Sequence, residues 1–486
     1  MASIDEIREA RLEKLKKLRD AGVNPYPAKV PKDIDLKALR NDFEAVSQSG
    51  REVSIAGRVL ALRGQGAILF AVIFDGTDRI QAIFKKDEMS ENLFNLFTDT
   101  VDLGDFISVT GPAITSQRGE QSVLAKSWLM ASKSLAPLPE KWHGLQDTEE
   151  RYRKRYLDLL LNDELRDLLV KKAKFWEVSR NFFKERGFLE VETPVLELTT
   201  GGAEARPFKT HHNDFDIDVY LRISVGELWQ KRLMAAGFPK TFEIGRVFRN
   251  EGSSLEHLQE FTNLEYYESF ADYKDGMNLV KDLYRTIATE VFGTTKFEAR
   301  GHSFDLADEW REIDYVDEVK KQTGIDLNTA TDDEIKAKLS ELQVKFEGDN
   351  RERLTDTLWK YCRKNISGPA FLVNHPLLVA PLAKLRDEGK TVQMFQPIIA
   401  GSEIGRGYSE LNDPLDQLDR FKNQEEILKS GDEEAMMADY EFVEMLEHGM
   451  PPTCGYGFGE RLFAIFANKP LRELQTFPLM RPNTEK

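Results

Sequence analysis

The chain has 486 residues, 41% of them hydrophobic, and a formal net charge of −16. This length predicts two or three domains of about 100–200 residues each. No apolar run reaches the ~18 residues that suggest a membrane span, and the N-terminus lacks the apolar core of a signal peptide. With only two cysteines, Cys362 and Cys454, there is no disulfide framework and no metal-binding pair. We therefore expect a cytoplasmic protein with no membrane partner.

The acidic charge is unevenly distributed along the chain. Taken alone, a net charge of −16 argues against a nucleic-acid partner, because phosphate neutralisation needs Lys and Arg. Residues 51–138, however, hold 9 Lys/Arg and 10 Asp/Glu. This stretch is close to neutral, so most of the acid lies elsewhere.

The first half of the chain suggests two regions. Ile4, Ile7, Leu12, Leu15 and Leu18 recur at helical spacing, which predicts an amphipathic helix over residues 1–22 within an N-terminal helical extension, residues 1–50. Residues 51–138 contain short β-like runs (EVSIAGRVLALR, ILFAVIFD, RIQAIF and DFISVTGPAI) separated by glycines. Four or five such strands are typical of a small closed barrel such as an OB-fold, and a generic β-domain is the alternative.

Residues 139–486 have a different pattern. A helical stretch leads to Gly187, and FLEVETPVL then predicts a strand that stops at Pro194. Further strand-like runs follow between residues 203 and 270. Strands grouped with helices, without βαβ alternation, indicate an α+β domain. The charged helical stretch at about 328–366 is interpreted as a surface insertion with no evident chemistry.

Residues 241–270 could form a two-stranded hairpin that carries polar groups on one face. Arg249, Glu265 and Tyr267 would share this face, with His257 and Phe261 in or beside the loop. A forked guanidinium suits a phosphate and a phenyl ring suits a base. An ordinary surface hairpin with a salt bridge is the alternative.

Two later segments add charge and glycine. In 401–414, Glu403 and Glu410 lie near Asn412 and Asp413, and such oxygen-rich groups can hold Mg²⁺, although an acidic turn is the alternative. The segment GYGFGER, residues 455–461, predicts a glycine-rich turn that enters an apolar helix and lets a nucleotide approach the backbone. No GxGxxG or GxxxxGK[ST] motif occurs in the chain, which disfavours Rossmann and P-loop sites.

Together these segments resemble the motifs of class II aminoacyl-tRNA synthetases. GFLEVETPVL (187–196) is similar to motif 1, FRNEG (248–252) through EF (260–261) to motif 2, and GYGFGER to motif 3. Over nearly the whole chain the resemblance is strongest to bacterial lysyl-tRNA synthetases of subclass IIb, through stretches such as LRDAGVNPYP, GGAEARPFKTHHN, LRISVGELWQKRL, SELNDP and FPLMRP.

This resemblance implies an antiparallel six-stranded catalytic sheet with flanking helices over 139–486, preceded by an OB-fold that binds the anticodon. It implies a homodimer that forms lysyl-adenylate from ATP and L-lysine with Mg²⁺ and then charges tRNA(Lys). It also implies roles for single residues. Arg249 and Arg461 would be catalytic; Arg249, Glu251, His257, Phe261, Glu403 and Arg461 would bind ATP, with Glu403 also a metal ligand; Gly202, Glu227, Glu265, Tyr267 and Glu410 would bind lysine; Phe70 and Gln81 would read the anticodon.

The chain departs from the family pattern at several positions, among them two of the expected site and Glu256, which replaces a basic residue in the motif 2 loop. Arg406 stands where an Asn is usual, and Gln396 where a Glu metal ligand is usual. The departures bear on specificity and metal count and leave Arg249, Arg461 and Glu403 intact. Three other functions remain as alternatives: transfer of lysine to a protein side chain, a non-catalytic RNA-binding role, and an aspartate or asparagine enzyme of the same subclass.

Overall fold

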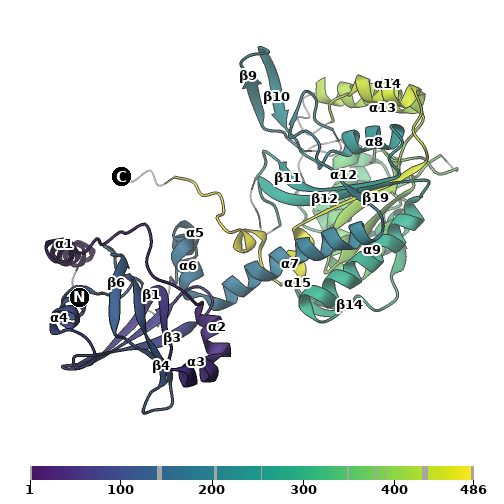
Figure 1. The fold of residues 1–486 in the computed structure, drawn as a ribbon. Coiled ribbons are helices and arrows are strands. Elements are labelled where there is room, and N and C mark those ends of the chain that lie inside the picture. The colour runs from purple at the N-terminus through teal and green to yellow at the C-terminus, as the bar shows by residue number, and fades with distance from the viewer. Residues whose placement is uncertain are drawn as a thin grey trace. The chain divides into compact units, whose positions relative to one another are not determined.

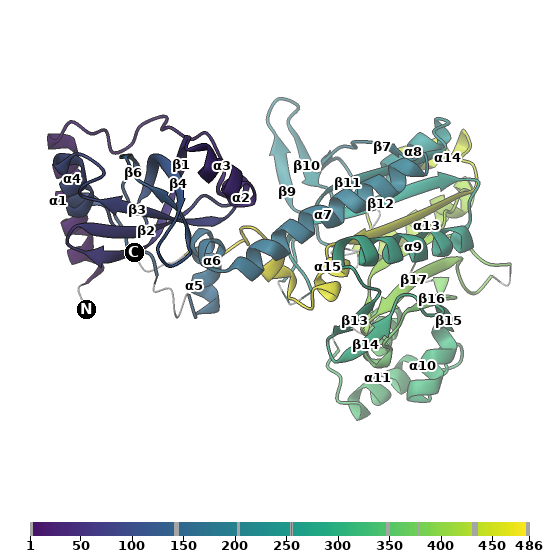
Figure 2. The same ribbon diagram turned by 60° about the horizontal axis from the view of Figure 1, so that its bottom comes forward.

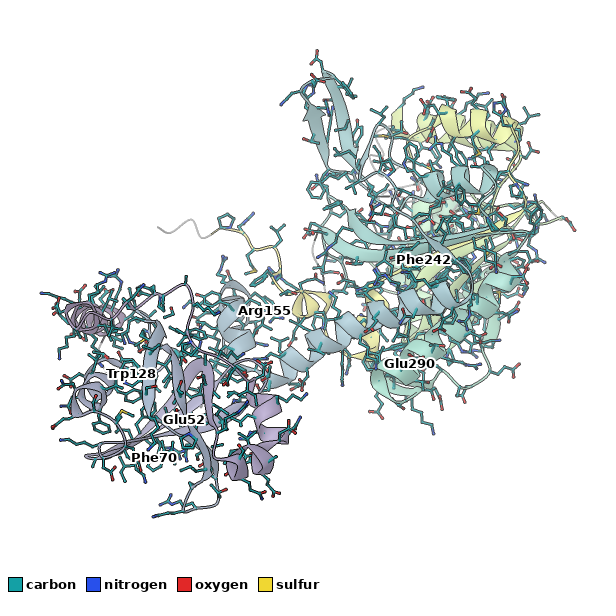
Figure 3. All side chains as sticks on the ribbon, in the orientation of Figure 1. Glu52, Phe70, Trp128, Arg155, Phe242 and Glu290 are labelled. Atoms are coloured by element: carbon teal, nitrogen blue, oxygen red, sulfur yellow. The ribbon has the colours of Figure 1, made fainter. Side chains whose placement is uncertain are left out.

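The computed structural model describes residues 3–139, 145–201, 205–252, 254, 256–346, 350–377, 380–387, 389–429 and 436–482, apart from the side chain of Gln65. The chain divides into two compact units, Met1–Leu161 and Asn162–Lys486 (Figure 1). Each unit has its own core: Trp128 belongs to that of the first unit and Phe242 to that of the second (Figure 3). In the described ranges, no helix combines the length and apolar character needed to cross a bilayer.

The first unit begins with the predicted amphipathic helix, α1 (Ile4–Asp20). The Ser3 hydroxyl accepts a hydrogen bond from Glu6 N, and the Glu6 carboxylate accepts one from Ser3 N, so both ends of a capping box are present. The chain leaves the helix through Gly22, whose φ is 75°. Helices α2 (Leu36–Asn41) and α3 (Phe43–Ser49) follow.

The next strands form a barrel. They are β1 (Glu52–Gln65), β2 (Ile68–Phe74), β3 (Arg79–Lys85), β4 (Phe106–Thr115), β5 (Gln121–Leu124) and β6 (Ser127–Ser132). Their order is β1-β2-β3-β5-β4-β6, and β1 also pairs with β4, which confirms the predicted closed OB-fold barrel. The structure has six strands rather than four or five, because QSVLAKSWLM (121–130) forms two more. Helices α4 (Glu91–Thr100), α5 (Thr148–Arg153) and α6 (Arg155–Leu161) complete the unit.

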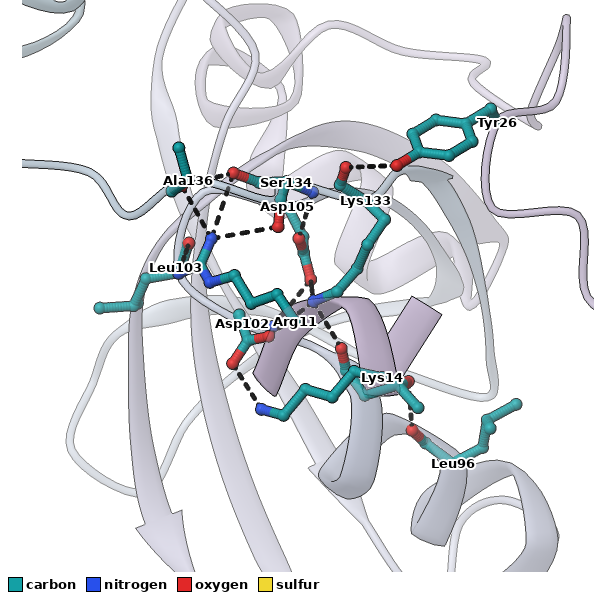
Figure 4. Close-up of polar contacts among 11 residues, drawn as sticks. Arg11, Lys14, Tyr26, Leu96, Asp102, Leu103, Asp105, Lys133, Ser134 and Ala136 are labelled. Atoms are coloured by element: carbon teal, nitrogen blue, oxygen red, sulfur yellow. Dashed lines mark hydrogen bonds and ion pairs between the residues drawn. The ribbon is translucent and has the colours of Figure 1, made fainter. Parts of the chain in front are cut away.

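A buried polar cluster fastens α1 to this barrel (Figure 4). Lys133 Nζ lies 2.6 Å from Asp102 Oδ2 and 2.8 Å from Asp105 Oδ2, and its side chain is fully buried. Lys14 of α1 pairs with the other oxygen of Asp102 at 2.6 Å. Arg11 of α1 donates hydrogen bonds to the backbone carbonyls of Leu103, Ser134 and Ala136. Asp102, which pairs with Lys133, thus also holds the helix on the barrel.

The second unit is built on a nine-stranded sheet. Its strands are β7 (Leu189–Glu190), β11 (Lys240–Phe248), β12 (Glu260–Ser269), β15 (Arg311–Asp314), β16 (Ala370–Val373), β17 (Met394–Ile399), β18 (Ser402–Glu403), β19 (Gly405–Ser409) and β20 (Thr453–Gly459). Their order is β15-β16-β17-β19-β20-β12-β11-β7, with β18 paired to β17. All neighbours from β16 to β11 are antiparallel, which confirms the predicted six-stranded antiparallel sheet; β15 and β7 extend it as parallel edge strands.

Smaller strands and the helices surround this sheet. β8 (Leu196–Glu197), β10 (Ile217–Leu221) and β9 (Lys209–His212) form a three-stranded sheet, and β13 (Lys296–Ala299) pairs with β14 (His302–Asp305). The segment expected to be one strand up to Pro194 holds only the two-residue strand β7, and β8 begins after the proline. The helices are α7 (Asp163–Glu185), α8 (Glu227–Ala235), α9 (Tyr273–Ile287), α10 (Tyr315–Thr323), α11 (Asp332–Glu341), α12 (Arg351–Cys362), α13 (Pro414–Lys429), α14 (Tyr440–Glu447) and α15 (Arg461–Phe466), with helical turns at Ala288–Phe292, Arg363–Asn365 and Leu471–Leu474.

The two faces of the large sheet differ in chemistry. Helices α7 and α9 lie along one face (Figure 2), where Tyr266 of β12 and Tyr456 of β20 are packed into the main core. Because side chains alternate along a strand, Glu265, Gly455 and Gly457 point to the opposite face. This second face carries the polar residues singled out from the sequence.

Candidate active site

A cavity of about 270 Å³ opens on this polar face. The residues predicted for nucleotide and amino-acid binding that line it are Glu227, Arg249, Glu251, His257, Phe261, Glu265, Tyr267, Glu403, Glu410 and Arg461. Gln396 and Arg406 line it too. Gly202 lies outside the described residues. Residues from separate strands, loops and helices thus meet in one site, and Arg249 and Arg461 line the same cavity rather than two.

The hairpin of β11 and β12 supplies the floor of the site. Its register pairs Glu243 with Glu265, and Glu265 and Tyr267 share the cavity face, as predicted. Arg249 follows the end of β11, where its guanidinium lies 5.4 Å from the centre of the Phe261 ring and donates to the backbone carbonyl of Ile223. An arginine and an aromatic ring side by side can receive a phosphate and a base.

The segment 453–459 is a central strand, β20, and not the glycine-rich turn that the sequence predicted. Glycine and aromatic residues alternate along it. A Cβ on Gly455 would come within 2.4 Å of both Glu410 Oε1 and Tyr267 Cε1, and one on Gly457 within 2.8 Å of Glu265 Cγ. The glycines are therefore required because acidic side chains from the neighbouring strands cross this surface. The alternation of glycine with larger residues, which repeats every two positions, was the signal in the sequence that a strand was present.

Around Arg461, a second group of residues suits a triphosphate. Arg461 opens helix α15, donates to the backbone carbonyl of Glu403 at 3.0 Å and lies 3.4 Å from His257 Nε2. Burial lowers the pKa of Arg461 and of Arg249, and both guanidinium groups remain charged. Burial, with Arg461 nearby, also lowers the pKa of His257. Glu256 Oε2 lies 4.0 Å from Arg461 Nε, so acids line this end too, and the two guanidinium groups are the part of it that suits an anionic ligand.

Trp359 of α12 contacts a residue that lines the cavity, and the sequence analysis did not predict this. Its indole Nε1 donates a hydrogen bond to Glu403 Oε1, and its side chain is almost fully buried. The stretch 328–366, interpreted as a surface insertion without chemistry, instead packs into a core shared with α10 and the strands β15–β17, in which Tyr315 packs on Trp359 with ring centres 5.0 Å apart. A buried tryptophan in an otherwise charged helix was the available signal.

The acidic end of the cavity is formed by Glu227, Glu265 and Glu410. Glu265 Oε1 accepts a hydrogen bond from Val225 N at 2.7 Å, and Tyr267 donates to its other oxygen at 3.3 Å. Glu227 and Glu410 are close enough to hold one ammonium. In the structure that ammonium is Lys231 Nζ, 2.9 Å from Glu227 Oε1 and 2.6 Å from Glu410 Oε2. The sequence analysis assigned both acids to a ligand and did not anticipate Lys231.

The oxygen-rich group expected in 401–414 does not form a single cluster. Glu403 bonds to Trp359, Glu410 pairs with Lys231, and Asn412 accepts from Lys384 at 2.7 Å. Glu403 and Glu410 lie at the ends of strands whose course carries them to different parts of the cavity. Within the described ranges, no group of three or more His, Cys, Asp or Glu could hold a metal ion.

Comparison with known proteins identifies the family. The family described as tRNA synthetases class II (D, K and N) matches residues 147–481, and the OB-fold nucleic acid binding domain matches residues 53–130. The chain belongs to the class II tRNA synthetases. It is 42% identical to the lysine–tRNA ligase of Thermotoga maritima, over 99% of this chain and 97% of that protein. It is also 42% identical to the lysine–tRNA ligase of Roseiflexus sp. (strain RS-1), over 99% of both chains.

Arg406 and Gln396 are the two residues of the cavity that differ from the pattern expected for this family. Arg406 of β19 lies on the same face as Tyr408 and Glu410. Gln396 Oε1 lies 2.8 Å from Nε2 of the buried His375, and burial lowers the pKa of that imidazole to about 3. The imidazole is therefore neutral and donates to the amide oxygen. Gln396 serves as a neutral partner at this point of the class II synthetase site.

The residues predicted to read the anticodon lie in the barrel of this synthetase. Phe70 of β2 and Gln81 of β3 are diagonal neighbours on one face, since Phe70 pairs with Ile83 and Val72 with Gln81. Phe70, labelled in Figure 3, is a half-buried residue, whereas Gln81 is only 5% exposed and donates to Ser122 Oγ at 2.9 Å. Phe70 is thus the more accessible of the two residues, and the side-chain amide of Gln81 is held by Ser122.

Proposed function

We propose that the protein is a lysine–tRNA ligase that forms lysyl-adenylate from L-lysine and ATP and transfers the lysyl group to tRNA(Lys). The observation that carries this proposal is the single cavity with guanidinium groups at one end and three carboxylates at the other. The names of the full-length relatives support the same activity. We further propose a cytoplasmic homodimer that contacts tRNA through its barrel.

Each end of the cavity has a role in the first step. Arg249 would bind the α-phosphate of ATP and Arg461 the γ-phosphate, while Phe261 stacks under the adenine and Glu251 and His257 contact the nucleotide. Glu265 would bind the α-ammonium of lysine, with Tyr267 bounding the pocket, and Glu227 and Glu410 lie at the side-chain end. The lysine carboxylate attacks the α-phosphorus, pyrophosphate leaves, and the mixed anhydride remains bound.

No nucleophilic side chain is needed, because the substrate carboxylate is itself the nucleophile. Catalysis then consists of alignment and of stabilising the charge that develops at phosphorus. In the second step the terminal ribose hydroxyl of the tRNA attacks the lysyl carbonyl carbon, and AMP leaves. The two arginines serve the first step in particular, since they face the phosphates throughout.

The residues present fit a Mg²⁺ ion that enters with the triphosphate rather than one held in a protein cage. Mg²⁺ takes one or two carboxylates and completes its coordination with phosphate oxygens and water. Glu403 lines the phosphate end and would be the main protein ligand. When bound, the ion would neutralise phosphate charge. Gln396 cannot add a carboxylate, which favours fewer metal ions than the usual family site holds.

The experiment that tests this function is pyrophosphate exchange into ATP, measured separately with each of the twenty standard amino acids. Lysine alone should support exchange, and purified tRNA(Lys) should then accept the lysyl group. Exchange with aspartate or asparagine, or with no amino acid, would contradict the proposal.

A further inference from the structure

Lys231 occupies an unusual position beside the cavity. It lies one helical turn after Glu227 on α8, so both side chains leave the helix on one face. Its side chain is 1% exposed, and its ammonium lies 5.4 Å from the centre of the Tyr408 ring and 5.8 Å from that of Phe442. Lys231 does not line the cavity itself, but both of its carboxylate partners do.

Lys231 contacts one carboxylate oxygen of Glu227 and one of Glu410. Glu227 Oε1 accepts from Lys231 and also from the Tyr408 hydroxyl. Glu410 Oε2 faces Lys231, whereas Glu410 Oε1 lies beside Gly455, where a Cβ would approach it to 2.4 Å. Gly455 lines the cavity. Among the described residues, none donates a hydrogen bond to Glu410 Oε1, so this oxygen is available to a ligand.

We propose that Lys231 is a positioning residue for amino-acid selection: it holds Glu227 and Glu410 on one ammonium and leaves Glu410 Oε1 as the acceptor for the substrate's side-chain ammonium. This inference rests on the proposed lysine activation. It assigns Lys231 no contact with substrate, since its effect passes through Glu410. A merely structural buried lysine would stabilise the fold without affecting how lysine binding depends on pH.

The electrostatics of the pocket link Lys231 to that pH dependence. Burial raises the pKa of Glu410 to about 8, while Lys231 opposes the rise and Glu227 adds to it. Burial, with Glu227 nearby, raises the pKa of Glu265 to about 7. Glu410 must be ionised to bind an ammonium, so lysine should bind more tightly as pH rises toward 8. Among the described residues, the other charged or titratable groups that interact with Glu410 or Glu265 are Glu197, Arg249, Tyr267, Tyr408 and Cys454, and Arg406 acts on Arg249 and Tyr408.

The test is the pH profile of the KM for lysine in pyrophosphate exchange, from about pH 6 to about pH 9. Lys231→Met removes the cation that opposes the rise in the Glu410 pKa. The profile should therefore move to higher pH by about one unit or more, and KM at neutral pH should increase by about tenfold or more. Lys231→Arg retains the charge and should retain the wild-type midpoint.

Lys133→Met is the matched control. Lys133 is also a fully buried lysine held between two carboxylates, but it lies in the barrel (Figure 4). This variant should lose stability and keep the wild-type profile. If Lys231→Met does not fold, Glu227→Gln provides the second measurement. Removing the carboxylate that raises the Glu410 pKa should move the midpoint to lower pH.

The outcomes separate the two proposals. If the wild-type protein shows no lysine-dependent exchange, the proposed function fails. If wild-type exchange is normal but Lys231→Met and Glu227→Gln keep the wild-type midpoint, the function stands and the role of Lys231 is refuted. A shift in Lys133→Met equal to that in Lys231→Met would also refute it, because the effect would then follow from stability alone.

Discussion

Trp359→Phe tests whether helix α12 supports the nucleotide end of the site. The change removes the indole N–H that donates to Glu403, while a ring remains to pack on Tyr315. A hydrogen bond to a charged group contributes about 1.5–3 kcal/mol. Since about 1.4 kcal/mol corresponds to a tenfold change, ATP activation should fall by about 10- to 150-fold if Glu403 loses its position entirely.

The assay is lysine-dependent pyrophosphate exchange measured against ATP at limiting and at saturating Mg²⁺. The loss should be larger at limiting Mg²⁺, because a displaced Glu403 is a poorer ligand, and the KM for lysine should stay unchanged. Trp310→Phe is the matched control in the same unit, since Trp310 is also buried but donates to the backbone carbonyl of Leu306. Full activity in Trp359→Phe, or an equal loss in Trp310→Phe, would refute the reasoning.

Three further predictions follow from single residues. Glu410→Gln should raise the KM for lysine by about 100-fold or more, because a buried ammonium loses a charged partner, and the KM for ATP should not change; an unaltered lysine KM would remove Glu410 from the pocket. Gln396→Glu places a carboxylate beside the neutral imidazole of His375, so the pKa of His375 should rise well above about 3, which NMR titration of the ring would detect. Phe70→Ala should raise the KM for tRNA about tenfold through lost base stacking, measured by aminoacylation, with lysine activation as the control; equal effects on both would contradict a tRNA role.

The sequence predicted the fold class and most of the residues that line the cavity. The signals for these were either patterns within a short segment or the resemblance to the synthetase family. The alternation in β12 placed Glu265 and Tyr267 on one face, and the structure confirms it. The glycine-rich segment of β20 was misread as a turn because glycine is also the commonest turn residue. The decisive information, the approach of Glu410 and Glu265 to those glycines, comes from strands distant in the chain.

Two contacts could not be predicted from the sequence because each joins a helix to residues far along the chain. Trp359 reaches Glu403 across 44 positions, and Lys231 reaches Glu410 across 179. Only the i, i+4 relation between Glu227 and Lys231 is readable from spacing, and it suggests an exposed helix pair rather than a buried bridge. The family resemblance supplied the acids as ligands, but it contained no information on their internal partner.

The alternating pattern of β20 has a practical consequence for mutagenesis. Cys454, Tyr456 and Phe458 belong to the main core, while Gly455 and Gly457 border the cavity. Substitutions at the even positions should therefore appear mainly as changes in unfolding temperature, whereas those at Gly455 and Gly457, which would crowd Glu410, Tyr267 and Glu265, should reduce turnover as well as stability. A scan of five consecutive residues would thus separate, within one strand, the positions that matter mainly for folding from those that also matter for the reaction.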